Sequence, residues 1–259
     1  GYAVKLGYGT ASNYVDLNLL NAADDQNSIT PNESIAPARN TVIGLTSRFT
    51  LVKKVSFELD AAGSAYTRDT RAQLIPLEQG SLLKAFTIFM PAQLSTQLTT
   101  ALQTAVGYQD KVFGLKLQYK RIDPNFQTMG AYYFQSDIVS YTVAPSLNLM
   151  NSKLRIMGSL GMQKDNLAQN KNAQTGRTVG SAVVSFNPST AFGLDLQFSN
   201  YGISQQAGLR PIIDTLRLAQ NNLSLMGNLR YNLQNESVSH LFTLTATHQQ
   251  LSDLNQNTD

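Results

Sequence analysis

Apolar and polar residues alternate one by one along most of this chain. From Phe113 to Lys120, phenylalanine, leucine and tyrosine occupy every second position, with glycine, lysine and glutamine between them. Residues 192–198 repeat the pattern with phenylalanine and leucine. Successive side chains of a β-strand point to opposite faces, so the alternation predicts strands with one apolar and one polar face. We therefore expect an all-β fold.

One segment fits two interpretations. From Leu94 to Leu102, leucines recur at every fourth position, which also suits one face of a helix. We interpret residues 91–106 as a strand, because a hairpin turn follows near residues 109–110.

Three hairpins can be aligned from their turn lengths and their matching faces. A shift of one residue would move every side chain to the opposite face, so the alternation restricts the register. The turns at 52–54, 151–152 and 235–236 predict Arg48 opposite Glu58 and Phe49 opposite Phe57, Leu149 opposite Leu154, and Leu233 opposite Val238.

Short and long connections also alternate along the chain. Short turns are expected near 10–13, 52–54, 109–110, 151–152, 187–191 and 234–237, and long polar loops near 21–40, 67–93, 123–137, 164–174 and 202–217. Six turns and five loops join twelve strands. This arrangement is typical of a transmembrane antiparallel up-and-down β-barrel with periplasmic turns and external loops. A soluble β-sandwich is the alternative, although it would usually have Greek-key crossovers and shorter strands.

We expect residues 1–259 to form a single barrel domain that is incomplete at both ends. If the short turns are periplasmic, the first strand starts outside the cell and the twelfth strand finishes there. Bacterial barrels usually start and finish in the periplasm, so the twelve strands are expected to belong to a barrel of fourteen or more. A complete twelve-stranded barrel with unusual ends is the alternative.

The composition argues against several classes of protein. Charged residues make up 14% of the chain, below the roughly 25% of soluble domains, and the net charge is only +3. No basic run is longer than Lys53-Lys54, so no nucleic-acid partner is expected. The chain has no cysteine and two histidines, so we expect no metal site and no cofactor.

The polar faces of the expected strands carry ten charged residues. Six are positive and four are negative, which suits a hydrated barrel lumen crossed by ion pairs. In the simplest interpretation they brace the inner wall, and in a functional one they form a weakly cationic path that favours anionic solutes. The expected lumen-lining charges are Lys5, Asp16, Arg48, Glu58, Asp60, Lys116, Lys120, Arg155, Asp195 and Arg230.

The apolar faces carry aromatic residues near several strand ends, as in the aromatic girdles of outer-membrane barrels. Packing in the core of a soluble protein is the rival explanation. The residues concerned are Tyr2, Tyr8, Phe57, Tyr108, Phe113, Tyr119, Phe192, Phe198 and Tyr231.

Catalysis and ion binding find little support in the sequence. His240 and His248 share the parity of apolar residues, so they are expected to point outward, away from any nucleophilic serine in the lumen. Asp24, Asp25, Asn27 and Glu33 offer oxygen ligands in one long loop, but their spacing lacks the glycine-centred calcium-loop pattern. An ordinary solvated loop is the simpler interpretation.

Three segments resemble outer-membrane barrel proteins of Bacteroidota. They are Tyr119 to Asp137 (YKRIDPNFQTMGAYYFQSD), residues 40–69 with NTVIGLTSRFTL and SAYTRD, and Gly161 to Leu167 (GMQKDNL). The resemblance implies fold and location and carries no catalytic residues. Within the first segment, Asp123-Pro124 should end a strand, because proline donates no hydrogen bond. Tyr132, Tyr133 and Phe134 then form either a stacking surface on an outer loop or part of an inward-folded plug.

The expected function is a non-enzymatic outer-membrane barrel that acts as a pore or as the membrane component of a transport or secretion assembly. Its partners would be outer-membrane lipid and lipopolysaccharide, and proteins of an envelope complex. A barrel with a plugged lumen that anchors surface partners is the first alternative. A barrel hydrolase and a soluble β-sandwich are the others.

Overall fold

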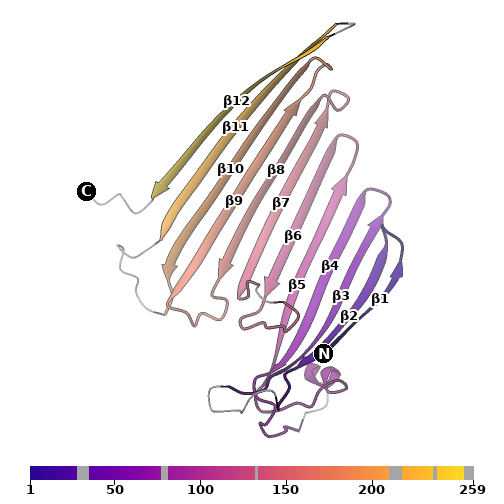
Figure 1. Ribbon diagram of the computed structural model, residues 1–259, viewed down its shortest axis with the longest axis vertical. Coiled ribbons are helices and arrows are strands. Elements are labelled where there is room, and N and C mark those ends of the chain that lie inside the picture. The colour runs from indigo at the N-terminus through magenta and orange to yellow at the C-terminus, as the bar shows by residue number, and fades with distance from the viewer. Residues whose placement is uncertain (28–34, 77–80, 132–133, 210–217, 236–237, 254–259) are drawn as a thin grey trace, which may run out of the picture. The chain divides into compact units, whose positions relative to one another are not determined.

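The computed structural model describes residues 1–27, 35–76, 81–131, 134–209, 218–235 and 238–253. Twelve antiparallel strands form one sheet in which each strand lies beside its neighbours in the chain (Figure 1). The predicted all-β, up-and-down arrangement is therefore confirmed. The strands are β1 (Tyr2–Gly9), β2 (Tyr14–Ala23), β3 (Arg39–Leu51), β4 (Val55–Thr67), β5 (Thr96–Gln109), β6 (Phe113–Ile122), β7 (Ile138–Leu149), β8 (Leu154–Asp165), β9 (Ala173–Phe186), β10 (Phe192–Ala207), β11 (Ala219–Gln234) and β12 (Ser239–Asp253).

Contacts within the sheet group the chain into two compact units. Unit 1 comprises Gly1–Leu51, Phe57–Thr104 and Lys120–Ile138. Unit 2 comprises Val52–Ser56, Ala105–Tyr119 and Val139–Asp259. Each unit is described by itself below.

The alternation of short and long connections is confirmed. Short turns span residues 10–13, 52–54, 110–112, 150–153, 187–191 and 235–238, and all the connections between them are longer. The strand interpretation of the ambiguous segment 91–106 is confirmed from Thr96 onward and is wrong for residues 91–95, which precede β5. Strand β6 ends at Ile122, immediately before Asp123-Pro124, also as predicted.

Two hairpin turns use left-handed backbone conformations at non-glycine residues. Val52 and Lys53 have φ angles of 52° and 59°, and Met150, Asn151 and Ser152 have φ angles of 54°, 54° and 71°. Left-handed turns match the right-handed twist of paired strands, whereas ordinary turns would splay them. The hairpins therefore close tightly.

Two of the three predicted registers agree with side-chain contacts. Arg48 and Glu58 form an ion pair, as their predicted opposition requires. In the β7–β8 hairpin, a methyl group placed on Gly158 would lie 3.5 Å from Cγ of Pro145, the residue that the prediction sets opposite it.

The predicted β11–β12 register is wrong by two residues. Leu233 lies opposite His240 instead of Val238, and Asn235 N–H donates to the Val238 carbonyl across the turn. A shift of two residues keeps every side chain on its original face. Matching of apolar faces therefore could not distinguish the two alignments.

The most deeply buried cluster of unit 1 lies at the end of the strands that carries the long loops. The loop between β4 and β5 contains a short 3₁₀-helix, η1 (Leu82–Phe86), that the sequence did not predict. Phe86 packs beside Gly63, where a Cβ atom would lie only 2.9 Å from the ring, so glycine is needed for this approach. The cluster consists of Ala65, Phe86 and Met90 with Ile43, Leu83 and Leu98 around it.

Candidate functional site

The ten charges predicted on the polar side of the strands define what we call the charged face, and the opposite side is called the apolar face. In unit 1, Lys5 Nζ lies 2.8 Å from Asp16 Oδ2. Gly7 is the residue opposite Asp16, so this pair crosses diagonally between β1 and β2. Arg48 Nη2 lies 2.6 Å from Glu58 Oε1 between β3 and β4. Both pairs lie near the short turns.

Unit 2 has a third pair of the same kind. Arg230 Nη2 on β11 lies 3.0 Å from Asp195 Oδ2 on β10 and also donates to Asn187 Oδ1. The Arg230 guanidinium crosses directly over Gly193, its cross-strand partner. Arg155 is on the same face, because it is paired with Ser185, which in turn faces Asp195.

Six of the ten predicted charges thus form three cross-strand ion pairs, and four remain. Lys116 takes part in a polar or electrostatic contact outside these three pairs. Within the part of the chain that the structure describes, Asp60, Lys120 and Arg155 have no ion-pair partner. Exposed pairs of this kind contribute little to stability, so the three pairs brace neighbouring strands without dominating the free energy of folding.

Between the charges, the charged face of unit 2 is neutral and polar. One cross-strand row has a serine on each of four consecutive strands, β8 to β11. Glutamine continues the row on β12. The row is Ser159, Ser181, Ser199, Ser224 and Gln249. Such a surface is hydrated but has little charge to select ions.

A hollow of about 500 Å³ opens on the charged face of unit 1. It lies over β1 to β6 and contains three of the predicted charges, Lys5, Asp60 and Lys120. Next to these charges its wall is formed by small and aliphatic side chains, including Leu20, Val42, Ala62, Ala101 and Ile122.

The loop after β6 folds onto this same face. Asn40 Nδ2 donates to Ser64 Oγ at 2.8 Å, and Asn40 Oδ1 accepts from the backbone N–H of Met129 at 3.0 Å. Ser64 Oγ donates to the Gln127 carbonyl at 2.5 Å. Asn40 and Ser64 are both fully buried. Gly130 packs closely against Leu20, which lines the hollow.

Asn40 and Ser64 are functional candidates that the sequence did not single out. The sequence indicated only that both residues occupy polar-face positions, near the ends of β3 and β4 that lead into the long loops. The backbone of residues 127 and 129 lies on the charged face, whereas the two interpretations of this loop concerned Tyr132, Tyr133 and Phe134 and both stay open. Phe134 packs edge-on against buried Phe126, with ring centroids 5.5 Å apart, while Tyr132 and Tyr133 lie outside the described residues.

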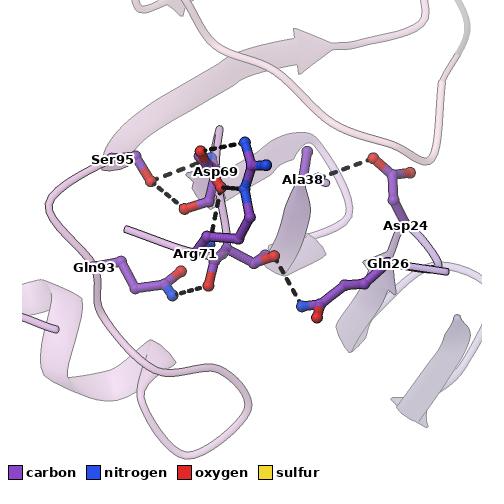
Figure 2. Close-up of polar contacts among 8 residues, drawn as sticks. Asp24, Gln26, Ala38, Asp69, Arg71, Gln93 and Ser95 are labelled. Carbon is purple, nitrogen blue, oxygen red and sulfur yellow. Dashed lines mark hydrogen bonds and ion pairs between the residues drawn. The ribbon is translucent and has the colours of Figure 1, made fainter. Parts of the chain in front are cut away.

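A polar network joins other loop segments of unit 1, as Figure 2 shows. Asp24 Oδ2 accepts from Ala38 N–H, and Gln26 Nε2 donates to Thr70 Oγ1. The Arg71 guanidinium and its backbone N–H all donate to the Asp69 carboxylate. These hydrogen bonds, led by those from the guanidinium, lower the pKa of Asp69.

The calcium interpretation gains no support from this network. The Asp24 carboxylate caps the backbone of Ala38, and Asp25 accepts from Asn27 N–H. Glu33 lies outside the described residues. Among the residues that are described, no group of three or more acidic, histidine or cysteine side chains could hold a metal ion.

The apolar face is exposed in both units. Leu6 is 67% exposed in unit 1, and in unit 2 Leu117 is 46% and Leu244 is 67% exposed. Aromatic residues gather at the short turns, where Tyr108 pairs with Phe113 and Phe186 with Phe192 at centroid distances of 6.3 and 6.4 Å. Other exposed members include Tyr2, Val4, Tyr8, Phe49, Tyr141, Val143, Leu160, Leu196, Phe198, Leu225, Tyr231 and Phe242.

The two histidines lie on this apolar face, as predicted. His240 and His248 share the alternation of Phe242 and Leu244 along β12, and all four side chains are exposed. Neither histidine has a carboxylate partner within ion-pair distance among the described residues. No serine–histidine arrangement is therefore assembled on the charged face by these two residues.

Comparisons with known proteins give no identity for the chain. No helix among the described residues is long and apolar enough to cross a membrane. No protein-family model matches the sequence, and neither curated proteins nor solved structures provide a match.

Proposed function

We propose that the chain forms the wall of an outer-membrane β-barrel pore and has no enzymatic activity. The single observation that carries this proposal is the contrast between the two faces of the sheet. Large apolar side chains are exposed along the apolar face of both units, and large contiguous apolar surfaces of this kind usually mark contact with a membrane or another protein. The opposite face carries ion pairs and hydroxyl groups, as a hydrated lumen requires.

The location follows from the same contrast. Such a wall needs lipid against its apolar face, so we place it in the bacterial outer membrane with lipid and lipopolysaccharide as partners. Proteins of an envelope complex are further proposed partners. The resemblance of segments within residues 40–167 to Bacteroidota outer-membrane barrels agrees with this placement.

We further propose that the barrel closes with additional strands, to fourteen or more. The strand order begins with β1 and finishes with β12, and nearly all residues of these two strands are exposed. An unpaired backbone group in hydrocarbon costs several kcal/mol, so both edges must pair. Hydrogen exchange of the intact protein in lipid should show every second amide of both strands protected by partner strands outside this sheet. Cross-links joining β1 directly to β12 would instead indicate closure at twelve.

A plugged scaffold is the second candidate, and one observation favours it. Residues 125–131 fold onto the charged face and are held by buried Asn40 and Ser64. If this segment narrows the lumen, the intact barrel conducts weakly and conduction increases when the segment is released.

Single-channel recording in planar bilayers tests both candidates. The proposed pore should show steady conductance, and Asn40→Ala should increase it by loosening the loop. Asn21→Ala is the matched control, because Asn21 Nδ2 donates to the Phe89 carbonyl of the β4–β5 loop and to Thr41 Oγ1 of β3 instead. A chain that never conducts, with or without Asn40→Ala, would exclude the pore and favour the scaffold.

A further inference from the structure

The hollow on the charged face of unit 1 has features of a solute site. Its volume of about 500 Å³ is within the usual range for small-molecule pockets, which combine an apolar wall with a few polar groups. The loop segment that Asn40 and Ser64 hold packs against Leu20 in its wall. The hollow is therefore bordered by this loop segment.

Two charges of opposite sign stand in this hollow without ion-pair partners. Asp60 is on β4 and Lys120 is on β6, with Gln103 of β5 on the strand between them. The third charge, Lys5, is already paired with Asp16. In the part of the chain that the structure describes, neither Asp60 nor Lys120 is neutralised by another side chain.

The apolar part of the hollow lies beside this dipolar pair. On each of the three strands an apolar residue lies two positions from the polar one, and therefore on the same face. The pairs are Asp60 with Ala62, Gln103 with Ala101, and Lys120 with Ile122. In all three strands the apolar residue is on the side of the long loops. A ligand whose two charged groups lie beside Gln103 would thus place its apolar side chain against Ala62, Ala101 and Ile122, on the side of the loop at residues 125–131.

We propose that this hollow binds small zwitterionic solutes with an apolar side chain, that is, apolar amino acids. Asp60 would accept hydrogen bonds from the ligand ammonium group, and Lys120 would donate to its carboxylate. The backbones of Asp60 and Lys120 are two strand spacings, roughly 10 Å, apart, and we take the carboxylate and the ammonium group to be separated by the same distance. Two hydrogen bonds of about 2.8 Å leave roughly 4 Å between the two charged groups of the ligand. This distance suits the ammonium and carboxylate groups of a single amino acid, and it is too short for the two charged ends of a peptide.

This inference rests on the proposed pore function and names the solute class that the pore would pass. Weak binding is expected, because a conducting site must release its solute. Both charged side chains are accessible to water, so each contact should change affinity by only about fivefold.

Binding can be measured with the intact protein in lipid nanodiscs, by NMR titration of four probes. Leucine should bind most tightly. N-acetylleucine lacks the ammonium group, leucinamide lacks the carboxylate, and trileucine separates the two charges, so each should bind about fivefold more weakly. Equal affinity for all four, or no saturable leucine binding, would overturn the inference.

Variants identify the residues involved. Asp60→Asn and Lys120→Gln should each weaken leucine binding about fivefold, and Asp60→Asn should leave N-acetylleucine binding unchanged. The double exchange Asp60→Lys with Lys120→Asp should restore leucine binding, because a zwitterion can reverse its orientation. Lys111→Gln, in the β5–β6 turn, removes the same charge away from the hollow and serves as the control. Unchanged leucine affinity in both single variants would contradict the assignment.

Conductance recorded on the same samples separates this inference from the pore proposal. Leucine should reduce single-channel current in the unaltered protein and much less in Lys120→Gln. A protein that conducts but shows no leucine effect retains the pore and refutes the solute site.

Discussion

The Arg48 guanidinium lies 2.6 Å from the Glu58 carboxylate across the β3–β4 hairpin, on the charged face of the sheet. This contact is the most specific register test that the sequence offered. A double-mutant cycle with Arg48→Gln and Glu58→Gln should give a coupling free energy of up to about 1 kcal/mol in denaturant unfolding from lipid vesicles, because both side chains are partly exposed.

The control for this cycle pairs Arg48→Gln with Asp60→Asn. Asp60 lies two residues beyond Glu58 on the same face and is not bonded to Arg48, so these two substitutions should be additive. Coupling of Arg48 to Asp60, and none to Glu58, would mean that the hairpin register is shifted by two residues.

The two faces of β10 should tolerate charge unequally. Leu196 is on the apolar face, and its neighbour Gln197 is on the charged face. Leu196→Arg should cost roughly 2–4 kcal/mol if it meets lipid near the midplane, whereas Gln197→Arg should cost less than about 1 kcal/mol. Leu115→Arg and Lys116→Glu form a second adjacent pair with the same expectation. Unfolding experiments in lipid vesicles measure all four variants, and similar losses on both faces would contradict the assignment.

Asp69 should titrate below an ordinary aspartate. Hydrogen bonds from the Arg71 side chain, and then from its backbone N–H, lower the pKa of Asp69. Because its folded pKa is below the unfolded value near 4, the contact stabilises the loop at higher pH and is lost as pH falls through the folded pKa. Carboxyl-carbon NMR should show Arg71→Gln raising this pKa and Arg68→Gln leaving it unchanged. A normal pKa in the unaltered protein would show that the contact does not persist in solution.

Period-two alternation and turn length were sufficient to predict the strands. All twelve strands are present and all six short turns lie within two residues of their expected positions, because both depend on local sequence. The Lys5–Asp16, Arg48–Glu58 and Asp195–Arg230 pairs join charges that were expected on one face.

Features that depend on contacts between distant loops were not predicted. The predicted β11–β12 register was wrong by two residues, because a shift of two residues leaves every side chain on the same face of the sheet. Helix η1 and its contact with Gly63 depend on tertiary packing, which periodicity does not report. Met129 N–H donates to Asn40 across 89 positions of the chain, and Ser64 donates to the Gln127 carbonyl across 63 positions.

Cysteine-scanning accessibility tests the membrane wall most directly. The chain has no cysteine, so single cysteines can be placed at residues 194 to 199 of β10 without background labelling. In proteoliposomes, a membrane-impermeant maleimide should label residues 195, 197 and 199 through the water-filled lumen. Lipid-attached quenchers should act on probes at 194, 196 and 198. Alternation of the two readouts is the predicted result, and maleimide labelling of all six positions without quenching would contradict a membrane-spanning wall.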